Sequence, residues 1–234
     1  MSPIEELKDI VTEGIALDIF DAEESLAFLD SIGTNADEIN KATFGAFFGT
    51  LQRYLNRQLV LSVSRLFEEP KKRYRIRSLR TAINVLENNA AAIVIPEKPN
   101  LIVALKALGA YTEGMEKATD EEITLEVVDF FSAKFPKANQ ESIAALDVAL
   151  YATKTIRDKN IAHSEAVSWD ELPKPTYVQL EHLVEIAKEF VGTVGLGYTS
   201  TVYSSNDPRE YYLSDDAKRS TRCLNRMFKK LGIG

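Results

Sequence analysis

The stretch from residue 37 to residue 69 constrains the fold of this chain most. Its apolar side chains recur at steps of three and four residues, and Pro70 follows as a helix terminator. This spacing is typical of the buried side of an amphipathic helix. The apolar positions are Phe44, Phe47, Phe48, Leu51, Tyr54, Leu55, Leu59, Val63, Leu66 and Phe67. The sequence therefore predicts one long helix from Asp37 to Glu69.

The same helical period recurs along most of the chain, and no stretch shows the alternation of apolar and polar residues that is typical of a strand. Further helices are predicted over residues 3–31 (as one or two helices), 78–92, 100–111, 120–134, 139–161 and 176–191. The predicted fold class is therefore all-α, a helical bundle with extra N-terminal and C-terminal helices.

The last part of the sequence differs in composition from this body. Residues 192–206 are rich in Gly, Ser and Thr, which predicts a loop. The Gly-rich string lacks the preceding strand and the following Lys-Ser/Thr of a phosphate-binding loop. A short basic helix is predicted after it, from Ala217 to Leu231. We interpret the chain as one domain over residues 1–200, with its core at about 40–192, followed by a tail over residues 201–234.

The composition is typical of a soluble globular protein, with 45% hydrophobic and 27% charged residues. The longest apolar runs are too short to span a bilayer, and the opening MSPIEELKDI does not resemble a secretory signal. A single cysteine excludes an internal disulfide and fits a reducing compartment. Two histidines and one cysteine leave too few ligands for a structural zinc site. We therefore expect a cytoplasmic protein that has no cofactor, no metal site and no membrane partner.

Charge is distributed unevenly along the chain. Residues 1–40 hold eleven acids against one base, whereas residues 53–80 hold nine bases against two acids. One interpretation is a phosphate-binding face for RNA, to which Lys159 would add a further cation. The other is a solvated corner whose bases pair with the acidic N-terminal helices. The candidate RNA-binding residues of the basic segment are Lys71, Lys72, Arg73, Arg75, Arg77 and Arg80.

A compact polar string, RDKNIAH, occupies residues 157–163 at the end of a predicted helix. A guanidinium matches phosphate oxygens and an imidazole exchanges protons near neutral pH. Arg157 and His163 would therefore suffice for transesterification of RNA without a metal, by attack of a ribose 2′-hydroxyl. Asp158 or Asn160 could hold either partner in position. On a continuous helix the pair would lie on different faces, so convergence requires the helix to end or loosen within the string.

Each histidine also has a structural interpretation. His163 could be a helix-end histidine whose ring hydrogen-bonds a carbonyl group. From the residues alone this structural interpretation is favoured. His182 lies beside apolar Leu183 on the predicted helix over residues 176–191, and we interpret it as a surface or boundary residue.

Two strings in the sequence resemble a known family. RDKNIAH resembles the motif of the abortive-infection branch, AbiU type, of the HEPN superfamily of small helical ribonucleases. The string Ser-Arg-Leu-Phe-Glu at residues 64–68 resembles a second string of that branch, and the resemblance covers residues 44–190. It implies an all-α, HEPN-like helical bundle that forms a homodimer. The two motifs would then face each other across one composite RNA cleft.

The resemblance also implies residue roles and an activity, and with it we favour catalysis for His163. Arg157 and His163 match the catalytic pair, and Asp158 matches the polar position after the arginine. Glu68 matches a further acidic position, which Arg65 would neighbour. The implied activity is that of a metal-independent endoribonuclease, a toxin-like effector in phage defence with a possible antitoxin or defence partner. Its products would carry a 2′,3′-cyclic phosphate and a 5′-hydroxyl.

Two alternatives stay open. The chain could be a non-catalytic HEPN dimer that serves as a scaffold for a nucleotide or a protein partner. It could also be a regulatory helical domain in which the RDKNIAH string merely caps a helix.

Overall fold

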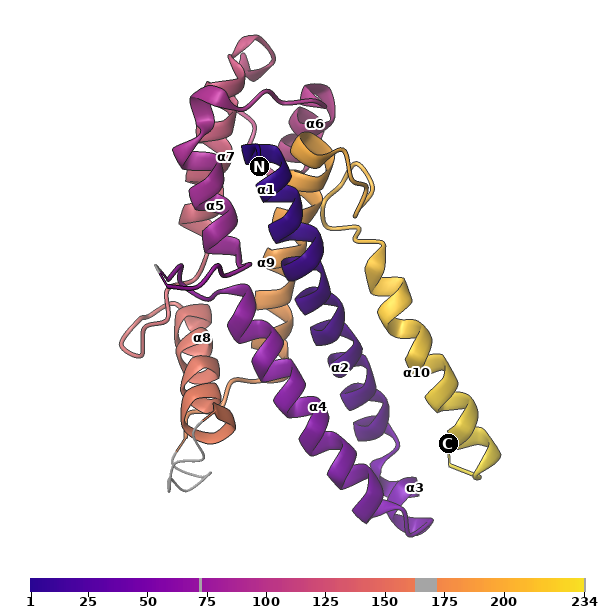
Figure 1. Ribbon diagram of the computed structural model, residues 1–234. Helices are drawn as coiled ribbons and strands as arrows, with labels where there is room; N and C mark the ends of the chain where they lie inside the picture. The colour runs from indigo at the N-terminus through magenta and orange to yellow at the C-terminus, as the bar shows by residue number, and fades with distance from the viewer. Residues whose placement is uncertain (72, 163–171, 234) are drawn as a thin grey trace. The chain divides into compact units, whose positions relative to one another are not determined.

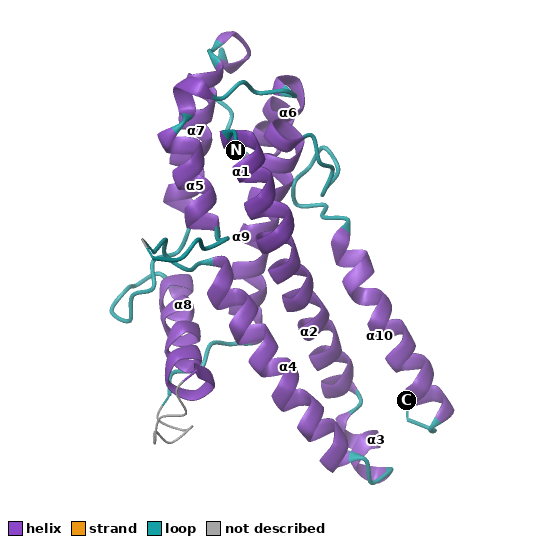
Figure 2. Cartoon of the chain, in the orientation of Figure 1, coloured by secondary structure: helices purple, strands orange, loops and turns teal. Residues whose placement is uncertain are grey.

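The computed structural model describes residues 1–71, 73–162 and 172–233. Over these ranges the chain forms helices and turns and no strand (Figures 1 and 2). The α-helices are α1 (Pro3–Ile10), α2 (Ala16–Thr34), α3 (Ala36–Lys41), α4 (Gly45–Leu66), α5 (Leu79–Asn88), α6 (Lys98–Leu108), α7 (Asp120–Lys134), α8 (Ala145–Ile156), α9 (Tyr177–Val194) and α10 (Leu213–Lys230). The predicted all-α fold class is confirmed.

Shorter helical turns connect several of these helices. Turns of π-helix cover Val11–Ile15, Arg157–Ala162 and Gly195–Thr199, and turns of 3-10 helix cover Ala90–Ala92 and Met115–Lys117. Among the described residues, no helix combines the length and the hydropathy that a membrane-spanning segment requires.

The chain divides into two compact units. Unit 1 comprises Met1–Ile19, Arg65–Lys137 and His182–Tyr212, and unit 2 comprises Phe20–Ser64, Ala138–Glu181 and Leu213–Gly234. The predicted division into a domain over residues 1–200 and a tail over residues 201–234 stays a prediction.

Aromatic rings fill the core of unit 1. Phe131 on α7 is fully buried, and its ring centroid lies 5.1 Å from that of Phe190 in an edge-to-face arrangement and 5.9 Å from that of Phe135. α5 packs against both α1 and α7. α7 begins where the sequence predicted, because Thr119 and Glu122 form a reciprocal capping box at its start.

The Gly-rich stretch in unit 1 is helical, and the predicted loop over residues 192–206 is wrong in its first half. α9 continues to Val194, and residues 195–199 form a buried π-helical turn. Close packing explains the glycines, since a Cβ on Gly197 would lie 2.9 Å from the Leu101 Cβ, and one on Gly195 would lie 2.6 Å from the carbonyl oxygen of Thr201. These glycines allow close backbone approach rather than flexibility.

In unit 2, the predicted helix over residues 37–69 is interrupted. Thr43 adopts a positive φ of 63° between α3 and α4, which breaks the helical backbone. The apolar period continues across this break because both helices face the same cluster. That cluster consists of Ile32, Ile39, Phe48, Leu224, Phe228 and Ile233.

The C-terminal helix contributes two of the buried residues of this cluster. α10 begins at Leu213, four residues before the predicted start, and its Phe228 ring lies 5.3 Å from that of Phe48. Asp215 and Asp216 lie in the first turn and Lys229 and Lys230 in the last, as favoured by the helix dipole.

Candidate functional site

The RDKNIAH string lies where α8 changes its helical geometry. α8 ends at Ile156, and residues 157–162 continue as a π-helical turn. The helix therefore loosens within the string. This is the condition predicted from the sequence for the polar side chains of the string to lie close together. Single π-helical turns inside helices are frequent at functional sites, because they reorient side chains relative to an α-helix.

The start of α8 differs from the prediction. The helix begins at Ala145 rather than near Asn139, whose side chain accepts a hydrogen bond from the Glu141 amide at 3.0 Å. Ser142 donates to the Asp147 carboxylate at 2.8 Å. Local side-chain hydrogen bonds of this kind compete with helical ones and delay the helix start.

Arg157, Asp158 and Asn160 are the described members of the candidate catalytic set. The Arg157 Nε donates to Asp158 Oδ1 at 2.7 Å, and the arginine side chain is 18% exposed, against 55% for the aspartate. The carboxylate thus holds one edge of a largely buried guanidinium. Asn160 is half-buried and Lys159 is exposed. His163 lies outside the described residues, as does Lys72.

The two auxiliary residues lie in unit 1, and each forms an ion pair with a different residue. The Arg65 Nε lies 2.9 Å from Asp18 Oδ1, and the Glu68 carboxylate lies 2.8 Å from the Lys71 ammonium. A role for Arg65 and Glu68 beside the RDKNIAH string stays a prediction.

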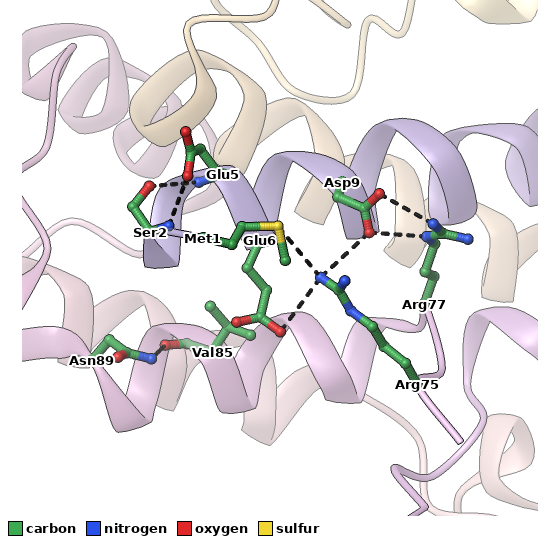
Figure 3. Close-up of polar contacts among 9 residues, drawn as sticks. All are labelled: Met1, Ser2, Glu5, Glu6, Asp9, Arg75, Arg77, Val85 and Asn89. Atoms are coloured by element: carbon green, nitrogen blue, oxygen red, sulfur yellow. Dashed lines mark hydrogen bonds and ion pairs between the residues drawn. The ribbon is translucent and has the colours of Figure 1, made fainter. Parts of the chain in front are cut away.

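The basic segment over residues 71–80, hereafter the basic corner, lies in unit 1 and contacts α1. Arg77 donates to both oxygens of Asp9, at 3.0 and 3.1 Å, and Figure 3 shows its side chain pointing toward that carboxylate. The Arg75 Nη2 lies 3.6 Å from a Glu6 oxygen and 3.5 Å from an Asp9 oxygen. The hydrogen bond from Arg77 lowers the pKa of Asp9. These two arginines therefore match the interpretation of a corner paired with the acidic N-terminus.

Two further bases of the basic corner, Arg73 and Arg80, also have local contacts. Arg80 is largely buried, donates to the carbonyl oxygens of Phe135 and Pro136 at 3.3 Å each, and lies 5.4 Å above the Phe135 ring. Arg73 lies 5.4 Å from the ring of Tyr74. RNA binding by the basic corner stays a prediction.

A pocket of about 540 Å³, hereafter the cationic pocket, lies within unit 2 beside the RDKNIAH string. Two of its lining residues, Asn160 and Ile161, belong to the string itself. Its complete lining is Arg53, Asn56, Arg57, Val60, Ile156, Asn160, Ile161, Lys174, Pro175, Tyr177 and Leu180.

Sequence reasoning missed most of this pocket. Residues 53, 56, 57 and 60 have the spacing of one helix face, which is a detectable signal on α4. The chain gives no comparable sign that Lys174 and Tyr177, more than a hundred residues later, lie at the same pocket. Among the described residues, no group of three or more His, Cys, Asp or Glu side chains could hold a metal ion.

Comparison with known proteins identifies a family. The family model HEPN_AbiU2, described as AbiU2, matches residues 4–219, which is most of the chain. No curated protein and no solved structure matches the sequence.

Proposed function

The chain belongs to the AbiU2 family of HEPN proteins, and from this premise we propose that it is a metal-independent endoribonuclease of abortive infection. The family places it among the HEPN domains associated with abortive infection, in agreement with the resemblance of the RDKNIAH string. The observation that carries the proposal is the position of residues 157–162 of that string on a π-helical turn, with Arg157 held by Asp158.

Arg157 acts as the phosphate clamp in this proposal. A guanidinium that is largely buried and held along one edge loses little conformational freedom when it binds a phosphate. The guanidinium can then stabilise the negative charge that develops on the phosphate oxygens in the transition state. Asp158 supplies the orienting contact, and Asn160, in the same turn, is a second orienting group.

His163 is the proposed general base and acid. It takes the proton from a ribose 2′-hydroxyl, whose oxygen attacks the adjacent phosphorus. The bond from phosphorus to the 5′-oxygen breaks, and that oxygen receives a proton. The products are a 2′,3′-cyclic phosphate and a 5′-hydroxyl. Glu68 and Arg65 are proposed auxiliary residues for this reaction.

We further propose a cytoplasmic homodimer in which two RDKNIAH strings form one composite RNA cleft. A toxin-like effector in phage defence would need restraint in the uninfected cell, so an antitoxin or defence partner is part of the proposal.

The test is incubation of the purified protein with total RNA and tRNA in EDTA. We expect cleavage by the wild type, with cyclic-phosphate ends, and a loss of at least about 100-fold in rate for His163→Ala and for Arg157→Ala. His182→Ala and Arg222→Ala are the matched controls, because both replace exposed residues outside the string. All variants should unfold at the same temperature as the wild type.

Two results would contradict the proposal. RNA that stays intact with a folded, dimeric wild type would favour the non-catalytic scaffold. Loss of folding in His163→Ala or Arg157→Ala, rather than loss of cleavage alone, would favour a string that caps the helix.

A further inference from the structure

The cationic pocket combines three segments of unit 2. α4 supplies one wall, the π-helical turn of the RDKNIAH string supplies the second, and the chain entering α9 supplies the third. Its volume of about 540 Å³ is within the range of pockets that hold small molecules. It therefore has room for one nucleotide.

Its floor is apolar. Val60, Ile156 and Leu180 are at most 8% exposed, and the first two belong to one buried cluster with Leu172, against which Ile161 packs. An apolar surface of this kind excludes water and favours a flat aromatic ligand such as a nucleobase.

The charged residues of its lining are all cations. Arg53 and Arg57 lie one helical turn apart on α4, and Lys174 comes from the segment before α9. No acidic residue occurs among the described residues that line the pocket. An anion is therefore the ligand that this lining favours, and arginine side chains suit phosphate oxygens in particular.

Tyr177 is held at the pocket by the start of α9. Thr176 and Gln179 cap the helix reciprocally, with the Thr176 amide 2.9 Å from Gln179 Oε1 and the Gln179 amide 3.2 Å from Thr176 Oγ1. The Tyr177 hydroxyl donates to Asn56 Oδ1 at 2.9 Å, yet the residue stays 50% exposed. A fixed and half-exposed ring offers a surface on which a base can stack.

We propose that the cationic pocket binds one nucleotide of the RNA substrate, next to the phosphate that is cleaved. This inference rests on the proposed ribonuclease function and names a substrate subsite for it. The base lies between the apolar floor and the Tyr177 ring, while Arg53 and Arg57 bind a flanking phosphate. Asn160 joins the pocket to the catalytic string, and its amide can donate to and accept from the edge of a base.

The first experiment measures binding of a short, fluorescein-labelled single-stranded RNA by anisotropy. All proteins carry His163→Ala, so that binding is measured without cleavage. Arg53→Gln/Arg57→Gln should raise the Kd about 10- to 100-fold, because charge-assisted hydrogen bonds to phosphate are lost. The slope of log Kd against log salt should fall by about 0.7 for each lost phosphate contact. The matched control, Arg219→Gln/Arg222→Gln on α10 of the same unit, should leave the Kd unchanged.

The second experiment separates stacking from a structural role of Tyr177. Tyr177→Phe keeps the ring and loses only the hydrogen bond to Asn56, so RNA affinity should stay close to that of the parent protein. Tyr177→Ala removes the ring and should raise the Kd about 5- to 100-fold. Equal Kd values for the two variants would contradict stacking. Thermal unfolding of both variants checks that the fold is intact.

The outcomes distinguish failure of the subsite from failure of the proposed function. If the wild type cleaves RNA but the pocket variants bind RNA as tightly as their parent, the proposed subsite is wrong and the proposed ribonuclease activity is supported. If the wild type does not cleave RNA but the pocket variants lose RNA binding, RNA binding at the pocket is supported and the ribonuclease activity is contradicted. If the pocket variants lose binding of AMP, CMP, GMP or UMP but keep RNA binding, the pocket holds a free nucleotide, and the RNA subsite is overturned.

Discussion

The basic corner of unit 1 and the cationic pocket of unit 2 both collect positive charge, but in different surroundings. In the basic corner, Arg75 and Arg77 lie within ion-pair distance of carboxylates on α1 (Figure 3). In the cationic pocket, Arg53 and Arg57 lie beside an apolar floor, and the described lining holds no acid. The basic corner has the higher density of bases in the sequence. The cationic pocket favours a phosphate more, because no carboxylate of its described lining competes for the arginines.

The density of bases along a chain is therefore a poor measure of phosphate affinity. An arginine that already binds a carboxylate must lose that contact before it binds a phosphate, so its net contribution to RNA binding is small. Arg53 and Arg57 are exposed like the two corner arginines, but the described lining beside them holds no acid that would compete with a phosphate. The surroundings of each cation decide which segment is the better candidate.

The largest expected effect is a difference in RNA affinity between two matched double variants. Arg53→Gln/Arg57→Gln should weaken RNA binding about 10- to 100-fold, whereas Arg75→Gln/Arg77→Gln should change the Kd by less than about threefold. Anisotropy with the same labelled RNA measures both. A larger loss in the corner variant would reverse the comparison and support the corner as the RNA-binding surface.

A smaller effect, on the free energy of unfolding, is expected from removal of the N-cap of α5, which follows the basic corner. Ser78 is fully buried, its hydroxyl donates to the Glu68 carbonyl oxygen at 2.8 Å, and it accepts from the Thr81 amide at 3.3 Å. Ser78→Ala should lower the free energy of unfolding by about 1–2 kcal/mol, because the Glu68 carbonyl oxygen and the Thr81 amide each lose a hydrogen bond.

Urea unfolding measures this loss against a matched control. Ser2 caps α1 in the same way but is exposed, so water replaces its hydrogen bonds, and Ser2→Ala should cost about 0.5 kcal/mol. Equal losses in the two variants would contradict a special structural role for the cap at residue 78.

The smallest effect is expected from the pairing of Asp9 in the basic corner. Since this pair is partly exposed, Asp9→Asn should cost about 0.5–1 kcal/mol of the free energy of unfolding near neutral pH. The pKa of Asp9 is lowered in the folded state, so its contribution is fully present above its ordinary value of 3.8 and is lost as the pH falls through the lowered folded value.

Urea unfolding of wild type and Asp9→Asn over this pH range tests the prediction. The difference between them should shrink as the pH falls below 3.8. A difference that stays constant would show that Asp9 stabilises the corner by something other than its charge.

The sequence predicted much of this architecture because helix formation depends on local patterns. The limits of α7 followed from its apolar period, and the RDKNIAH string together with the string at residues 64–68 indicated the family. Other local patterns in the sequence predicted the wrong structure. The glycines of residues 192–199 are typical of a loop in sequence, but packing against Leu101 and Tyr203 keeps that segment helical and buried.

The all-α class, most helix positions and the HEPN family could be predicted from the amino-acid sequence, because a helical period and a short motif each consist of nearby residues. The packing of the helices sets how α8 loosens at Arg157, which arginines pair with carboxylates and which line a pocket. Arg77 meets Asp9 across 68 positions, and Tyr177 meets Asn56 across 121. Contacts over such separations depend on how the helices pack, and no local pattern in the sequence encodes them.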